Sequence, residues 1–79
     1  MLENINEIDN DLIYKVALYC VDNPILIVNI QNKFLLAFRK AFNIMNRLEE
    51  LGIVTSRTED GTRKILITDK EEIKKRIYE

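Results

Sequence analysis

The sequence predicts a small α+β domain, built from helices with one β-hairpin ahead of the last of them. Its 79 residues are 47% hydrophobic, which suits a single small core and excludes a disordered chain. Apolar residues recur at helical spacings of three and four over much of the chain. Two short β-rich runs flank the turn dipeptide Asp60-Gly61, which is typical of a hairpin.

The first predicted helix covers residues 10–22. Asp9 and Asn10 both have side chains that cap helix N-termini, and a broad apolar arc follows them. Pro24 ends this helix because the residue before a proline is pushed out of the helical region. The β-branched-rich run 25–27 then predicts a very short strand.

Residues 28–34 and 37–51 form the next two predicted helices, separated by a brief bend. The longer one is the clearest in the sequence because its apolar residues fall on one face, and Gly52 stands where a C-terminal cap belongs. Beyond the hairpin, Thr68 and Glu71 have the spacing of a capping box and open a last helix.

A short helix, a longer amphipathic helix and a β-hairpin follow one another in the order of a winged helix-turn-helix. The predicted fold class is therefore α+β: three helices, a β-hairpin wing and an added C-terminal helix. The helix over 37–51 takes the place of the recognition helix. We expect residues 1–9 to be an N-terminal tail, 10–68 the winged-helix domain and 69–79 the added helix.

The residue types present argue against an enzyme, a metal protein and a membrane protein. Histidine is absent, Ser56 is the only serine and no glycine-rich phosphate loop is present, so we expect no catalysis, cofactor or metal. The single cysteine, Cys20, is expected in the core and indicates a reducing compartment. Without a signal peptide or an apolar run near the roughly 20 residues of a membrane helix, we expect a cytoplasmic protein.

The formal net charge of −1 conceals an uneven distribution. Residues 1–22 hold five acids and one base, whereas residues 23–48 hold four bases and no acid. On the helix over 37–51, arginines and asparagines share the polar face, and these side chains can pair with guanine and adenine in the DNA major groove. We therefore expect double-stranded DNA as the partner. The predicted contacts are Arg39, Lys40, Asn43 and Arg47 with base edges and nearby phosphates, and Lys33, Arg57, Arg63 and Lys64 with the DNA backbone.

The stretch 34–54, FLLAFRKAFNIMNRLEELGIV, resembles the gamma domain of FtsK/SpoIIIE-type DNA translocases. That family reads approximately F-R-I-G-Y-N-R-A-A-R-L-x-x-x-L-E-x-x-G-I-V. The matching residues are Phe34, Phe38, Lys40, Ala41, Leu48, Glu49, Gly52, Ile53 and Val54. Further upstream, Gln31 and the run DLIYKVA (11–17) also resemble the family, so that the resemblance covers about residues 10–67.

This resemblance implies a winged helix that binds short DNA sequences orienting chromosome translocation and that contacts a tyrosine recombinase. The family's base-reading positions hold Arg39, Lys40 and Asn43 here, and only Lys40 keeps the charge type, so the family's sequence preference is not expected. No Walker A motif is present, so we expect no translocase motor. The chain is either an excised fragment or a stand-alone regulator, and Met1 favours the second.

The sequence is also compatible with other functions. The near-zero net charge and the acidic first helix are compatible with a winged helix that contacts protein, or with a small dimeric transcriptional regulator; the process served is transcription regulation or chromosome segregation. We expect Phe38 in the core and Phe42 at the border of the polar face, where it could contact a partner. Ile73 and Ile77 either pack on the domain or form a homodimer seam.

Overall fold

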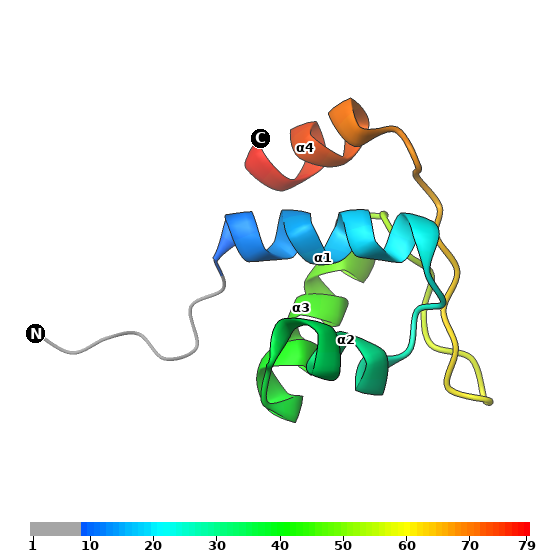
Figure 1. Ribbon diagram of the computed structural model, residues 1–79. Helices are drawn as coiled ribbons and strands as arrows, with labels where there is room; N and C mark the ends of the chain where they lie inside the picture. The colour runs from blue at the N-terminus through cyan, green and yellow to red at the C-terminus, as the bar shows by residue number, and fades with distance from the viewer. Residues whose placement is uncertain (1–8) are drawn as a thin grey trace, which may run out of the picture.

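The computed structural model describes residues 9–79, which fold around four helices (Figure 1). These are α1 (Asn10–Asp22), α2 (Ile27–Phe34), α3 (Phe38–Glu50) and α4 (Lys70–Tyr78). Helix α1 lies between α4 on one side and α3 on the other, and α2 packs against α3. A long loop carries the chain from the end of α3 back to α4.

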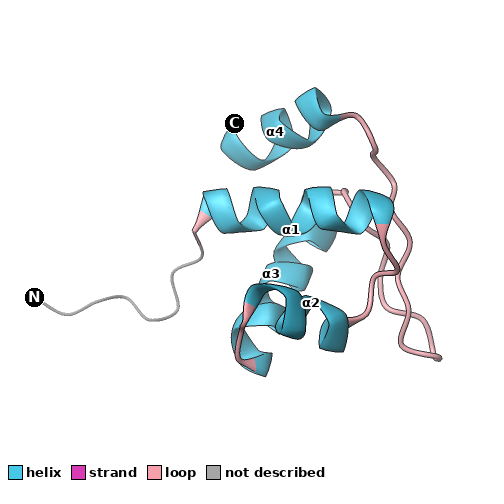
Figure 2. Cartoon of the chain, in the orientation of Figure 1, coloured by secondary structure: helices cyan, strands magenta, loops and turns pink. Residues whose placement is uncertain are grey.

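The α+β fold class expected from the sequence is wrong, because the structure over residues 9–79 is all-helical and has no β-strand (Figure 2). The expected wing is a loop whose two arms pair at one isolated antiparallel bridge, between Val54 and Ile65. The expected strand over 25–27 is also absent: Ile25 makes a single bridge to Arg63, and Ile27 already belongs to α2. Because the β-hairpin wing does not form, the winged-helix assignment is also wrong.

Side chains take the place of a strand ladder in this loop. The Thr55 amide donates to the Lys64 carbonyl at 2.9 Å, but the Lys64 amide donates to the Thr55 hydroxyl at 3.0 Å instead of to a main-chain carbonyl. The next residue back, Arg63, bridges to Ile25 and not to the opposite arm. The bridge between Val54 and Ile65 is therefore not followed by a second pair of backbone-bonded residues, and no strand forms.

The predicted bounds of the first helix, 10–22, are confirmed by α1. Its N-cap is Asp9, whose carboxylate accepts a hydrogen bond from the Asp11 amide at 2.9 Å. The cap predicted for the last helix is wrong by one residue. Asp69, not Thr68, accepts from the Glu71 amide, at 3.1 Å, so α4 begins at Lys70 without the expected capping box.

Helix α3 ends as its glycine predicts. Gly52 has a φ of 76°, and the amides of Gly52 and Ile53 donate to the carbonyls of Glu49 and Leu48 at 3.0 and 2.9 Å. This pair of bonds satisfies carbonyls that a helix end leaves open, and the positive φ turns the chain into the loop.

The core is formed by apolar residues from every helix and from the loop. The buried set is Ile13, Val16, Ala17, Cys20, Ile25, Ile30, Ala41, Ile44, Met45, Leu48, Ile53, Val54, Ile73 and Ile77. The alternatives left open for α4 are thereby decided, because Ile73 and Ile77 pack on the rest of the domain. The Tyr78 hydroxyl, which donates to Asp11, adds a second tie between α4 and α1.

Candidate nucleic-acid interface

Helix α3 has one buried face and one polar face. Its buried residues are Ala41, Ile44, Met45 and Leu48, which follow the spacing of one helical stripe and pack into the core. The opposite face therefore points away from the core. It carries Arg39, Asn43, Asn46, Arg47 and Glu50, with Lys40 at its edge.

Positive charge is concentrated at the N-terminal end of this polar face. Arg39 and Lys40 are exposed, and within the described residues neither side chain has an ion-pair or hydrogen-bond partner. Ala37 precedes them as an N-cap that offers no side-chain acceptor, so the first amides of α3 are open as well. Unpaired amides at a helix N-terminus add a partial positive charge to that of the two side chains. An anion is therefore favoured at this end of α3.

Arg47 lies further along the face and is held only loosely. Its guanidinium lies 3.3 Å from Glu50, and both side chains are exposed. Such surface pairs are worth about 0–1 kcal/mol, so Arg47 can turn to another anion at little cost.

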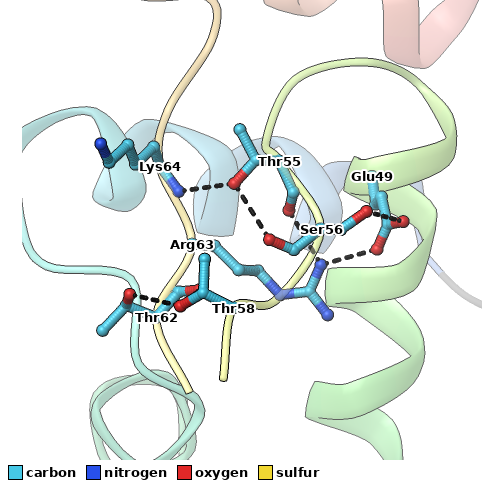
Figure 3. Close-up of polar contacts among 7 residues, drawn as sticks. All are labelled: Glu49, Thr55, Ser56, Thr58, Thr62, Arg63 and Lys64. Atoms are coloured by element: carbon cyan, nitrogen blue, oxygen red, sulfur yellow. Dashed lines mark hydrogen bonds and ion pairs between the residues drawn. The ribbon is translucent and has the colours of Figure 1, made fainter. Parts of the chain in front are cut away.

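Arg63 serves the fold rather than the surface (Figure 3). Its side chain is only 8% exposed, and the guanidinium donates to the Glu49 carboxylate at 2.8 Å and to the Thr55 carbonyl at 3.1 Å. The Ser56 hydroxyl donates to the same carboxylate at 2.7 Å. These hydrogen bonds hold the pKa of Glu49 below its ordinary value, and the bond from Ser56 has the larger effect. We call Glu49, Ser56 and Arg63 the clamp, because they fasten the loop to the end of α3.

The two remaining loop cations, Arg57 and Lys64, line different pockets. Arg57 lines a small pocket with Phe42 and Met45 of α3, so it lies beside that helix. Lys64 lines an open groove with Asp22 and Asn23 at the C-terminal end of α1 instead. The pocket at Arg57 has a volume of about 30 Å³, room for only a few water molecules and too little for an organic ligand.

The structure thus brings together only part of the predicted set. The polar face of α3 and its edge supply Arg39, Lys40, Asn43 and Arg47. Lys33 lies in the last turn of α2, just before the turn into α3, and Arg57 lies beside α3. Arg63 is taken up by the clamp, and Lys64 lies at another groove. We call the six retained residues the basic face.

The expectation that Phe38 lies in the core is wrong, and nothing contradicts the border position expected for Phe42. Phe38 is 54% exposed, whereas Phe42 is half-buried and lines the pocket near Arg57. The rings stack with their centroids 5.8 Å apart. Leu35 was missed altogether: it is 90% exposed and has a φ of 57°, and a leucine in sequence carries no signal for that conformation.

Three further features of the described residues concern thiol chemistry, metal binding and membrane spanning. Cys20 is buried as predicted, and burial raises the pKa of its thiol to about 12. No cluster of three or more potential metal-ligating side chains occurs within residues 9–79. None of the helices described is long and apolar enough to cross a membrane.

Comparison with known proteins leaves the chain without an assigned family. No family model matches it, no curated protein matches it, and no solved structure matches it. The resemblance to the FtsK gamma domain therefore stays a prediction from the residues.

Proposed function

We propose that the protein binds double-stranded DNA through the basic face, with the N-terminal half of α3 in the major groove. The observation that carries this proposal is the cationic end of α3: Arg39 and Lys40 are exposed and unpaired within the described structure, beside open helix amides. No acidic residue occurs between positions 23 and 48, so nothing in that segment repels a phosphate.

The dimensions of α3 suit a groove. Its 13 residues make a rod about 20 Å long and about 10–12 Å across, and the major groove of B-DNA is about 12 Å wide. In this arrangement Arg39 and Asn43, which are one helical turn apart, face base edges together. Lys33, Lys40 and Arg57 lie at the sides, where phosphates run along the groove.

Charge sets the expected binding strength. Each phosphate neutralised adds about 0.9 to the slope of log affinity against log salt concentration. With Lys33, Lys40, Arg47 and Arg57 on phosphates, we expect a slope of about −3.6. For duplex of unselected sequence, we expect a dissociation constant of about 10⁻⁴–10⁻⁶ M at physiological salt.

The resemblance to the FtsK gamma domain supports the further expectation that binding depends on DNA sequence. A tyrosine recombinase as protein partner rests on that resemblance alone. A cytoplasmic location is supported by the single buried thiol, which is typical of proteins in reducing compartments. We propose a binding role and not a catalytic one.

Fluorescence anisotropy with a labelled mixed-sequence duplex at two salt concentrations tests the proposal. We expect Lys40→Ala to lower the salt slope by about 0.9, and Arg39→Ala to weaken binding, since a bidentate arginine–guanine pair is worth about 1–3 kcal/mol. Lys74→Ala on α4 is the matched control, because it removes another exposed cation away from the basic face. No binding at about 50 mM salt, where phosphate contacts are strong, would refute the proposal.

A further inference from the structure

The turn between α2 and α3 exposes apolar side chains where polar ones are usual. Leu35 is 90% exposed and Phe38 is 54% exposed, and the two are three positions apart. Three residues of chain span at most about 11 Å, so the two exposed residues lie close together at this turn. We call this area the apolar tip.

Leu35 gives the fold no benefit that would explain its presence. It ends α2 in the left-handed conformation, φ 57° and ψ 51°, which glycine or asparagine adopts more easily. A buried leucine could compensate for this strain through its contacts, but Leu35 is almost fully in solvent. Strained residues of this kind are concentrated where a protein contacts a ligand.

Phe38 is exposed but held in place. It is the first residue of α3, and its ring stacks on Phe42, with 16° between the ring planes. Phe42 in turn lines the pocket with Met45 and Arg57. A ring supported from behind loses little freedom when it meets a partner, which favours binding.

The charge around the apolar tip indicates what its partner is. Lys33 precedes Leu35, and Arg39 and Lys40 follow Phe38, with no acid in the whole segment 23–48. A polyanion complements this surface, so the apolar tip meets an apolar group carried on a polyanion. In the major groove of DNA that group is the C5-methyl of thymine, which aliphatic and aromatic side chains contact.

We propose that Leu35 and Phe38 contact thymine methyl groups in the major groove, so that the protein selects thymine beside the bases read by Arg39 and Asn43. This inference rests on the proposed function, since it requires α3 in the groove. It adds a specificity determinant that charge alone does not supply, because phosphate contacts do not depend on sequence.

Replacing thymidine with deoxyuridine tests the contact directly, since it removes the methyl group and keeps the Watson–Crick pairing. The probe is the tightest-binding duplex selected by the wild-type protein from a randomised pool, remade with deoxyuridine. We expect wild-type affinity to fall at least about fourfold, the effect of one buried methyl-sized group. Phe38→Ala and Leu35→Asn should bring the ratio of the two affinities toward one, and Lys74→Ala should leave it unchanged.

Leu35→Asn also separates contact from folding. Asparagine tolerates the left-handed backbone, so we expect the variant to melt no lower than the wild type while its preference for thymidine falls. Equal affinity of the wild type for both duplexes, or a selected site without thymine, would overturn the inference and leave DNA binding intact. Failure to bind any duplex would refute the proposed function, and the apolar tip would then be a candidate protein-contact surface.

Discussion

Alanine at Gly52 should destabilise the protein more than alanine at Gly61. Both glycines have a positive φ, 76° and 86°, a backbone conformation that costs other residues about 1–2 kcal/mol. A Cβ added at Gly61 meets no atom within 4 Å, whereas one added at Gly52 comes within 2.9 Å of the Arg76 guanidinium. Gly52→Ala therefore carries a steric cost that Gly61→Ala lacks.

The size of that extra cost follows from what Arg76 loses when it moves. Its guanidinium donates to the Leu51 carbonyl at 3.0 Å and to Glu72 at 3.1 Å, which ties α4 to the end of α3. The bond to Leu51 contributes about 1 kcal/mol, and the exposed head of Arg76 moves aside at little further cost. Alanine also lowers the conformational entropy of the unfolded chain, which offsets about 0.4–1 kcal/mol of the loss at both sites. We therefore expect the free energy of unfolding to fall by about 1 kcal/mol for Gly61→Ala and by about 2 kcal/mol for Gly52→Ala.

Urea unfolding followed by circular dichroism measures both losses. Repeating Gly52→Ala in an Arg76→Ala background completes a double-mutant cycle. There the cost of Gly52→Ala should fall to that of Gly61→Ala, since the clashing group is gone. Equal costs for the two glycines in the wild-type background, or an undiminished cost for Gly52→Ala without Arg76, would refute the reasoning.

Three further outcomes are expected. Leu35→Asn should leave the free energy of unfolding equal to that of the wild type or raise it by up to about 1 kcal/mol, because backbone strain is relieved and no buried contact is lost; a clear loss in urea unfolding would contradict this. Glu49→Gln should lower the melting temperature near pH 7, and the deficit should shrink in acid. A carboxylate whose pKa is lowered by folding stabilises above its ordinary pKa of 4.5, and that effect is lost as the pH falls through the lowered value; a deficit independent of pH would argue against the clamp. Ile44→Val should cost about 0.5–1.5 kcal/mol in urea unfolding, because Ile44 is fully buried, and an unchanged midpoint would place it outside the core.

Local signals made the helices predictable. Asp9 and Pro24 bound α1, and the apolar stripe of α3 separates its buried face from its polar face at the correct register. The polar face, with Arg39 and Lys40 at its N-terminal end, could therefore be found from spacing alone. The cap of α4 was missed by one residue because Thr68 and Asp69 are both good capping residues, and only the structure shows which of them accepts the hydrogen bond.

The loop after α3 could not be predicted in the same way. Its composition is that of a hairpin, but whether strands form depends on competition between main-chain pairing and side-chain hydrogen bonds, such as that from the Lys64 amide to Thr55. The pairing of Arg63 with Glu49 joins residues 14 positions apart, which spacing within one element cannot reveal. The loop cations thus look alike in the sequence. In the structure Arg63 is largely buried and paired with Glu49, whereas Arg57, which lines the same pocket, is exposed.

The most direct test of the central claim is residue-resolved NMR of the protein titrated with a mixed-sequence duplex at low salt. We predict that amide shifts are largest over the turn and the first half of α3, at residues 35–43, with smaller shifts at Arg57 and none on α4. Shifts centred on α4, or no shifts at duplex concentrations of about 10⁻⁴ M, at the weak end of unselected binding, would contradict the assignment of α3 as a DNA-binding helix.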